Sequence, residues 1–437
     1  MKGRFAVAWG FLALIAVGAL LLMTPWANVR GTWGDPVSAT FTACSAVCVT
    51  GLSVVDIASE YTRAGQVVLL TLVELGCLGL MTFGTFIMIA IGRRLSLSRE
   101  FSLMNAYGVE QVLGFRGLVC WVVGSMLAIE GLGALSLYFC FGDWWTAGFY
   151  SAMSFCNAGF SLLPDSVTAF AGRPAVLFVL AFETILGGIG FLVIYNLITF
   201  KFLRRKSGGK GRLSLHAKVV LRVSFILLVL AFAAFLLLEW NGALAKYGFG
   251  EKLWIGFYQA VTPRTCGFCV TPTGELHPLT RLVYEVLMFI GGAPGSAAAG
   301  IKVTTLAVLF YTLRAMCRSE HETVIYQRAV SFDTVRESIV IFMALVVLIV
   351  VITGALLLTD ASRGVPIDAL LFESISAITT TGLSMDDTTV RLSLAGKVVI
   401  MCAMFLGRLG ALTVVLMIGD RESARHLGYP NEELVVG

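Results

Sequence analysis

The sequence contains few charged residues and very few histidines. Of its 437 residues, 14% are Asp, Glu, Lys or Arg, whereas a soluble domain carries about a quarter. Its four histidines form no HExxH motif and no plausible ligand pair, which argues against a zinc site. Serine and threonine residues lack a histidine base, so hydrolase chemistry is unsupported. The chain is therefore predicted to have no enzymatic activity and no organic cofactor.

The chain is instead rich in long apolar runs. Hydrophobic residues make up 57% of the chain, and its mean hydropathy is +0.86. Apolar runs of about 20 residues recur, which is the length that a helix needs to cross the hydrocarbon core. The first run is predicted to be a retained span, because no small-residue cleavage site follows it before Arg30. Ten cysteines lie mostly in apolar stretches, which favours buried thiols over a disulfide framework.

Eight apolar segments are predicted to be membrane spans, and they fall into four pairs. The segments are 5–27, 64–91, 115–140, 174–200, 216–240, 279–313, 335–359 and 396–419. The pairs enclose half-polar stretches at 28–63, 141–173, 241–278 and 360–395. The termini and the loops between pairs hold about twice as many Lys and Arg residues as these stretches. The positive-inside rule therefore predicts a multi-pass protein of the bacterial inner membrane with both termini cytoplasmic, and the net charge of +5 needs no nucleic acid to explain it.

The half-polar stretches share a short motif around a glycine. The motifs read CVTGLS, CNAGFS, RTCGFC and TTTGLS, and their glycines are Gly51, Gly159, Gly267 and Gly382. The intervals between these glycines are 108, 108 and 115 residues. A single glycine would mean little, because glycine is common in membrane helices. Four glycines in phase, each midway between two spans, indicate an internal repeat.

Such a repeat favours a cation pore. Each stretch has room for a short helix before its glycine, as at 37–48 or 370–379, and non-helical backbone at membrane depth must be buried or line a watery cavity. Four copies around an axis would aim carbonyl oxygens inward to replace a cation's hydration shell. Glycine permits the required dihedrals, and the helix C-termini add negative potential. The predicted fold is all-α and polytopic, with four helix–pore-loop–helix repeats in a pseudo-fourfold arrangement around a central pore.

The repeats are predicted at 1–92, 93–206, 207–318 and 319–437, the last with a short cytoplasmic C-terminus. An intramembrane loop at 291–300 interrupts the second span of the third repeat, because glycine and proline together break a helix. The loop either gates the pore or is a kink that packs helices. Its candidate gate residues are Gly291, Gly292, Pro294, Gly295, Ser296 and Gly300.

Several polar residues near these elements allow two interpretations. Arg408 interrupts the last apolar segment, where it either faces the pore as a barrier to cations or pairs with a buried acid. Four acids beyond the glycines either concentrate cations at the mouth or are solvated loop residues; they are Asp56, Asp165, Asp386 and Asp387. The CxxC at 266–269 suggests a redox or metal site, but its phase with the other three glycines argues against one.

These motifs resemble the Trk/Ktr/HKT superfamily of potassium transporters, and most of all its Ktr-type membrane subunit. The resemblance covers nearly the whole chain and is carried by the four glycine motifs, by GIKVTT at 300–305 and by FLGRLG around Arg408. The chain also begins directly with a span–pore–span unit, as the Ktr type does. Cys48, Cys266 and Cys269 depart from the expected Thr, Ala and Asn, which affects fine selectivity and sodium dependence rather than conduction.

The resemblance implies a function and a set of site residues. It implies potassium uptake or symport, with K⁺ and in some cases Na⁺ as the transported ion, in a homodimer embedded in membrane lipid. A cytoplasmic nucleotide-binding ring of the RCK type would regulate the loop gate, and Lys302 would help to hold that gate closed. The implied ion-binding residues are Val49, Thr50, Gly51, Asn157, Ala158, Gly159, Thr265, Cys266, Gly267, Thr380, Thr381 and Gly382.

A different class of function fits some of the same features. A sodium- or proton-coupled secondary transporter with alternating access also uses repeats and broken helices near the midplane. Such repeats are typically inverted or two-fold, whereas the four units here share one orientation. The pore is therefore the favoured interpretation, and the coupled carrier is the alternative.

Overall fold

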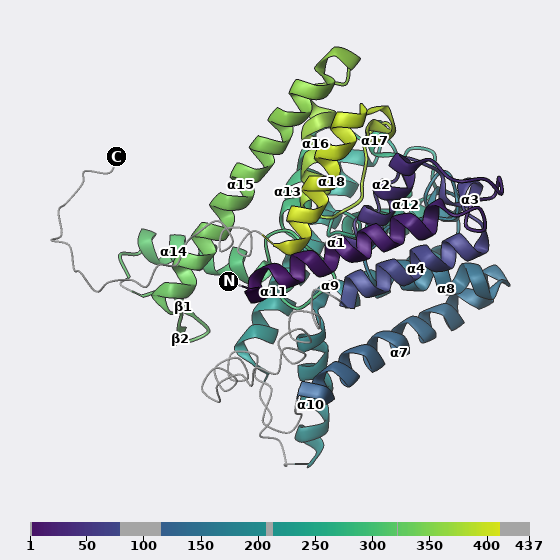
Figure 1. Ribbon diagram of the computed structural model, residues 1–437. Coiled ribbons are helices and arrows are strands. Elements are labelled where there is room, and N and C mark those ends of the chain that lie inside the picture. The colour runs from purple at the N-terminus through teal and green to yellow at the C-terminus, as the bar shows by residue number, and fades with distance from the viewer. Residues whose placement is uncertain (1, 79–114, 207–212, 321, 411–437) are drawn as a thin grey trace.

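The computed structural model describes residues 2–78, 115–206, 213–320 and 322–410, and these are almost entirely helical (Figure 1). The longer helices are α1 (Lys2–Met23), α4 (Arg63–Leu78), α7 (Phe115–Phe141), α9 (Pro174–Ile189), α10 (Phe191–Lys206), α11 (Leu215–Glu239), α13 (Pro278–Phe289), α14 (Val303–Cys317), α15 (Phe332–Asp360) and α18 (Leu394–Leu409). The short elements are α3 (Ile57–Glu60), α17 (Thr388–Arg391), the 3₁₀ turns Thr168–Phe170, Thr273–Glu275 and Ala361–Arg363, and the hairpin of β1 (Val324–Ile325) and β2 (Arg328–Ala329).

Several of these helices are long and apolar enough to cross a membrane. Among the described residues, Cys120–Phe141, Leu215–Glu239 and Phe332–Arg363 qualify alone, and α9 with α10 qualifies as a bent pair. Less than a third of the apolar window in each single span is buried inside the protein. On α15, for example, Leu358 is 90% exposed. Apolar side chains exposed over the whole length of a helix match a lipid environment, which confirms the predicted all-α membrane fold.

Four short helices fill the centre of the molecule. They are α2 (Pro36–Val47), α8 (Trp144–Phe155), α12 (Phe249–Val261) and α16 (Ile367–Ile378). Their C-terminal halves are buried, whereas their N-termini lie near the surface. Each follows a predicted span and precedes one of the four glycines, so the short helices expected at 37–48 and 370–379 are confirmed.

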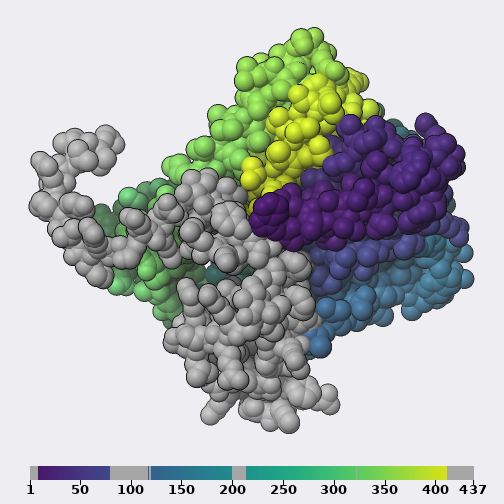
Figure 2. All heavy atoms as spheres, in the orientation of Figure 1, coloured from purple at the N-terminus to yellow at the C-terminus, as the bar shows by residue number. Residues whose placement is uncertain are grey.

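The first and last parts of the described chain lie side by side. Figure 2 shows the atoms of the N-terminal helices directly against those of α18, and α2 contacts α18 in the interior. Along the chain, α2 packs on α1 and α4, α8 on α7 and α9, α12 on α11 and α9, and α16 on α15 and α18. The chain therefore closes on itself around the four short helices.

Within the described residues, the predicted spans 174–200 and 279–313 are each interrupted, and only the second interruption was expected. The segment 279–313 is interrupted between α13 and α14, as its glycines and proline predict. The segment 174–200 was expected to be one helix, but it bends by 95° between α9 and α10. The bend lies at Gly190, whose φ of 89° no other residue type adopts readily. Parts of the predicted spans 64–91 and 396–419 lie outside the described residues.

Candidate ion-conduction site

The four glycine motifs share one unusual backbone conformation. The residue two positions before each glycine is left-handed, with φ between 49° and 70°, and each glycine has φ between 68° and 91°. The left-handed residues other than glycine are Val49, Asn157, Thr265 and Thr380. A positive φ is rare for a β-branched residue and costs about 1–2 kcal/mol. The recurrence of this conformation in all four motifs means that the surrounding structure enforces it.

The end of each short helix produces this conformation. At the end of α2, the backbone N–H of Thr50 donates to the carbonyl of Ser45 at 2.8 Å, and that of Val49 donates to Ala46 at 3.0 Å. These two bonds are those of a Schellman motif, in which the residue after the C-cap is left-handed. The ends of α8 and α16 repeat both bonds. The end of α12 differs, because the backbone N–H of Cys266 donates to the carbonyl of Thr262 at 3.0 Å, four residues back rather than five.

The four glycines form a closed ring. A methyl group built onto any of them would collide with the carbonyl oxygen that precedes the glycine of another motif. The pairs, in order round the ring, are Gly51 with Ala158 (2.2 Å), Gly159 with Cys266 (2.8 Å), Gly267 with Thr381 (2.8 Å) and Gly382 with Thr50 (2.0 Å). Only a residue without a side chain fits there, and the order of contacts follows the chain and returns to its start.

The structure thus brings all twelve candidate ion-binding residues together in the interior. The eight that are not glycines are at most 1% exposed, Gly267 is buried, and the other three glycines are half-buried. The hydroxyl groups of Thr50 and Thr380 are buried and have no hydrogen-bond partner among the described residues. The thiol of Cys266 lies against the hydroxyl of Thr184 at 3.2 Å, on α9. Its side chain is therefore held behind the ring, and its backbone carbonyl is the part that contacts Gly159.

A second set of glycines, which the sequence analysis did not single out, lies just behind this ring. A methyl group on Gly76, Gly187 or Gly407 would lie 2.1, 1.9 or 1.8 Å from the carbonyl oxygen of the last residue of α2, α8 or α16, respectively. Each of these glycines allows the helix that follows a motif to touch the end of the short helix before it. Their common distance of 25 to 28 residues after the motif glycine was a signal available in the sequence.

The predicted loop packs against the bend between α9 and α10. It runs from Ile290 to Lys302 and contains all six candidate gate residues. Its backbone bonds to the bend are Ala293 N–H to Gly188 O (2.9 Å), Ala297 N–H to Gly187 O (3.3 Å) and Phe191 N–H to Gly295 O (3.1 Å). Because Gly187 also packs against Phe155 and Asn157, the loop lies one layer away from the second motif.

Lys302 and Arg408 hold this loop from two sides. The Lys302 ammonium donates to the carbonyl of Ala298 at 2.5 Å. The Arg408 guanidinium, which is 1% exposed, donates to Ala297 O at 2.7 Å and to Gly76 O at 2.9 Å. No carboxylate lies within 4.0 Å of Arg408 among the described residues, so an ion pair with a buried acid does not explain it. Arg408 instead connects the loop to α4 through backbone carbonyls.

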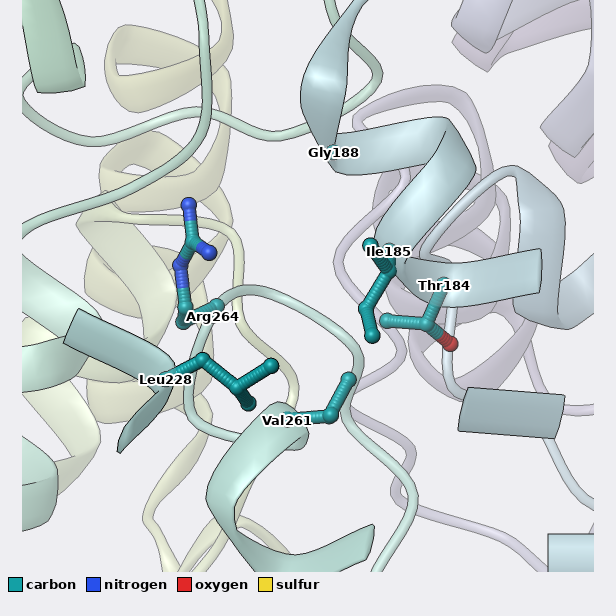
Figure 3. Close-up of a pocket in the computed structure, with 6 residues that line it drawn as sticks. All are labelled: Thr184, Ile185, Gly188, Leu228, Val261 and Arg264. Atoms are coloured by element: carbon teal, nitrogen blue, oxygen red, sulfur yellow. The ribbon is translucent and has the colours of Figure 1, made fainter. Parts of the chain in front are cut away.

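A further basic residue stands immediately before the third motif. Arg264 follows α12, and its guanidinium donates to the Ser224 hydroxyl on α11 at 3.2 Å. It borders a cavity of about 10 Å³, which holds about one water molecule, together with residues of α9 and α11 (Figure 3). Within the described part of the chain, Arg264 has no carboxylate within 4.0 Å. A fixed positive charge therefore lies behind the ring on this side.

The structure places the four candidate acids of the mouth in two kinds of surroundings. Asp56 is an N-cap, because its carboxylate accepts a hydrogen bond from the backbone of Ala58 at 3.4 Å. The other three acids are exposed.

All ten cysteines are free thiols, as predicted, and five of them are buried. Over the described residues, no group of three or more His, Cys, Asp or Glu side chains is arranged to hold a metal ion.

Fold and site together define a polytopic α-helical membrane transporter. The family model of the TrkH cation transport proteins matches residues 10–425, and the chain belongs to this family. It is therefore a cation transport protein of the membrane rather than an enzyme. The Trk/Ktr resemblance that the motifs indicated is confirmed.

Individual relatives match over nearly the full length. The chain is 35% identical to the Ktr system potassium uptake protein B of Bacillus subtilis (strain 168), covering 99% of this chain and 96% of the relative. It is 32% identical to the potassium/sodium uptake protein NtpJ of Enterococcus hirae, with the same coverage of both chains. The crystal structure of the potassium transporter TrkH from Vibrio parahaemolyticus has the same fold, with a TM-score of 0.76 at 17% identity. That match covers 95% of this chain and 84% of the other.

Proposed function

We propose that the chain takes up potassium across the bacterial inner membrane through a selectivity filter made by the four glycine motifs. The observation that carries this proposal is the closed ring, in which each glycine contacts a carbonyl oxygen of another motif. The relatives named for potassium uptake support the choice of ion, and the one named for potassium and sodium makes Na⁺ a second candidate.

The ring suits a cation whose hydration shell must be replaced. Positive φ at alternate residues turns successive carbonyl groups to one side, and four such segments supply oxygens from all directions. The four short helices end at the ring, so the negative ends of their dipoles favour a cation there. The free hydroxyl groups of Thr50 and Thr380 add two further oxygen ligands. The ion-binding residues proposed are the twelve of the four motifs.

The loop 290–302 acts as the gate in this proposal. The loop bonds to α9 and α10 through backbone groups, and each of these bonds involves a glycine. Arg408 and Lys302 donate hydrogen bonds to carbonyl groups of the loop itself. Few side chains anchor it, so a modest change in these bonds is enough to move it. The positive charge of Arg408 at the loop adds an electrostatic barrier to a passing cation.

The partners proposed are those that the Trk/Ktr resemblance implies. We infer a homodimer, each subunit with its own pore, and a cytoplasmic nucleotide-binding ring of the RCK type. With both termini cytoplasmic, the segment 314–336, which follows the gate through α14, faces the same side as that ring. It carries four arginines, three acids and the β1–β2 hairpin, so it offers a charged docking surface close to the gate. Charge reversal there should remove the partner in co-purification, and unchanged assembly would argue against this surface.

Uptake in proteoliposomes tests the filter. Wild-type protein is expected to carry K⁺ and Rb⁺ down their gradients, and Gly267→Ser is expected to lower affinity or selectivity. Gly267 is the residue of choice, because its side-chain position lies 2.8 Å from Thr381 O, whereas that of Gly382 lies only 2.0 Å from Thr50 O. The Gly267 variant therefore has the better prospect of folding.

The same measurement separates the pore from the coupled carrier. Flux that follows the electrochemical gradient without saturation supports the pore. A fixed stoichiometry with Na⁺ or H⁺, together with a Gly267→Ser variant that equals wild type in rate, affinity and selectivity, would favour the carrier.

A further inference from the structure

A buried acid in the fourth short helix has no part in the function proposed so far. Glu373 lies within α16, nine residues before Gly382, and is 0% exposed. The corresponding positions before the other three glycines are Thr42, Tyr150 and Tyr258. All four side chains carry a polar group and are buried.

At two of these positions, the side chain contacts a serine two residues after the ring glycine of the same motif. The Tyr150 hydroxyl lies 2.8 Å from the hydroxyl of Ser161, which is two residues after Gly159. The Ser384 hydroxyl, two residues after Gly382, donates to Glu373 at 3.0 Å. The short helix before the ring and the chain after it are thus joined by one side-chain contact, at equivalent places in the second and fourth motifs.

The contact of Glu373 is the more extensive of the two. Thr389, in α17, also donates its hydroxyl to the Glu373 carboxylate. The backbone carbonyl of Ser384 accepts from Thr273, which follows the third motif. Ser384 therefore links the third and fourth motifs, and Glu373 holds Ser384 in place. The glycine two residues earlier, Gly382, makes the tightest contact in the ring.

Glu373 can be compared with other buried acids of the described residues. Glu239 and Asp360 each accept a backbone N–H at the start of a helix, from His277 and Ser393, respectively. Glu373 lies in the middle of a helix and accepts from the hydroxyls of Ser384 and Thr389, much as Glu183 in the middle of α9 accepts from the hydroxyl of Ser151. No Lys, Arg or His lies within 4.0 Å of it in the described residues. A buried carboxyl without a basic partner is unfavourable for folding alone.

We propose that Glu373 is a positioning residue of the filter, and that its hydrogen bonds to Ser384 and Thr389 set how strongly the pore discriminates between K⁺ and the smaller Na⁺. The carbonyl oxygens can select K⁺ only if the ring does not close around a smaller ion. Glu373 fixes the chain on the outer side of Gly382, which keeps the fourth motif at its distance from the first and third. The inference rests on the proposed filter function.

The test compares variants for the ratio of Rb⁺ to Na⁺ flux in proteoliposomes. Glu373→Gln keeps the size of the side chain but replaces one acceptor oxygen by a donor, so the Ser384 hydroxyl loses one of the two oxygens to which it donates. We expect this ratio to fall at least about threefold, the effect of a partly lost hydrogen bond to a charged group. Ser384→Ala should also lower the ratio. The double variant should lower it by less than the two single effects added together, because both substitutions disrupt the same contact.

Asp360→Asn is the matched control, because it alters another buried acid of the same repeat that bonds to a serine, Ser393. It is expected to lower the melting temperature and to leave the flux ratio unchanged. The proposal is overturned if folded Glu373→Gln keeps the wild-type ratio, or if Asp360→Asn changes the ratio as much. If Glu373→Gln does not fold, Ser384→Ala decides alone, and an unchanged ratio there overturns the proposal.

Gly267→Ser, measured in the same vesicles, separates this inference from the filter itself. If Gly267→Ser changes the flux ratio and Glu373→Gln does not, the positioning role is rejected and the proposed filter is retained. A Gly267→Ser variant that equals wild type rejects the filter, and the role of Glu373 with it.

Discussion

At the scale of single residues, the ring depends on backbone conformations that its side chains do not favour. Val49, Thr265 and Thr380 are β-branched and left-handed, a combination that costs of the order of 1–3 kcal/mol each and is typical of functional sites. Schellman bonds at the helix ends hold Val49 and Thr380, and the contacts of the ring glycines hold all three motifs in place. The four motifs therefore adopt a locally unfavourable backbone so that their carbonyl groups point in one direction.

The four ring glycines are expected to differ in their tolerance of a methyl group. Gly382→Ala should abolish Rb⁺ uptake and reduce the yield of folded protein, because its methyl group would lie 2.0 Å from a carbonyl oxygen. Gly267→Ala, at 2.8 Å, should keep partial uptake, although its positive φ still costs about 1–2 kcal/mol. Uptake per mole of folded protein and thermal unfolding measure both effects. Equal losses in the two variants would contradict this ranking.

Arg408 is expected to restrain the gate. Arg408→Gln removes the positive charge and at least one of the two bonds to Ala297 and Gly76, so resting cation flux without any partner protein should rise several-fold. Arg408→Lys keeps the charge but lacks the planar fork that reaches two carbonyls at once, and should give an intermediate flux. Proteoliposome flux of Rb⁺ measures this. A flux at or below that of wild type in Arg408→Gln would show that Arg408 does not restrain conduction.

The ring residues could be predicted from the sequence, whereas the side chain that supports them could not. The glycines stand in phase between paired spans, and that phase is visible in one dimension. The contact of Glu373 with Ser384 exists only because the chain folds back beyond Gly382. A comparison of the position nine residues before each glycine would have shown a polar residue four times, which was the available signal.

At the scale of elements, each short helix begins with an acid and ends at the ring. Asp35 and Asp143 are N-caps, Glu251 accepts from the backbone of Gly248, and Asp368 lies in the first turn of α16. A negative charge at the N-terminus compensates the positive end of the helix dipole. The negative ends of the four dipoles are then left facing the centre without an opposing charge from the helices themselves.

The N-caps lead to a prediction about pH. The backbone N–H and hydroxyl of Ser38 donate to Asp35 and hold the pKa of its carboxyl below the ordinary value. A lowered pKa in the folded state means that the stabilisation is complete above the unfolded pKa and is lost as pH falls through the folded one. The melting temperature of Asp35→Ala should therefore lie below that of wild type by a constant amount between pH 5 and 8. The difference should shrink below about pH 4. A difference that shrinks already near pH 6 would contradict this assignment.

The ends of the first spans hold the second spans of the third and fourth repeats. Glu239, at the end of α11, accepts from the backbone of His277 at 2.8 Å and the hydroxyl of Thr280 at 2.5 Å. Glu239→Ala leaves these donors buried, so it should destabilise the protein by about 1–3 kcal/mol. Thermal unfolding in detergent measures this, with Glu337→Ala on the exposed side of α15 as the control. Equal melting temperatures for Glu239→Ala and wild type would show that the contact is dispensable.

The two broken spans show what hydropathy can and cannot predict. The break at 290–302 combines proline with several glycines, and such a combination is incompatible with a continuous helix. The bend at Gly190 lies in an apolar run that has the length and composition of one span. It arises because the loop donates to and accepts from Gly188 and Phe191, which lie far from it in sequence. No window along the chain contains that information.

At the scale of the whole molecule, orientation in the membrane remains a prediction that one cysteine can test. Cys317 is exposed at the end of α14, on the side assigned to the cytoplasm, whereas the exposed Cys120 and Cys402 lie within α7 and α18, which are predicted spans. A membrane-impermeant maleimide should label wild type in inside-out vesicles and lose that labelling in Cys317→Ser. Labelling of Cys317 in right-side-out vesicles would reverse the topology.

The all-helical membrane architecture could be predicted from the sequence, because lipid allows few alternatives for apolar runs of this length. The exact limits of the four repeats stay predictions. So does the pseudo-fourfold arrangement, although the cyclic order of the glycine contacts is what such an arrangement would produce. The contact of α2 with α18 lay beyond sequence reasoning, because it depends on how the first and last units meet.

That meeting has a consequence for biosynthesis. The ring closes only when Gly382 reaches Thr50, and Arg408 binds Gly76 across 332 residues of sequence. Contacts between residues so far apart form late, because the intervening chain must first be in place. A nascent chain with three of its four motifs inserted therefore lacks the carbonyl wall that closes the ring. For the proposed filter, this means that a conducting structure exists only once nearly the whole chain has been translated, and that a chain still on the ribosome does not leak ions.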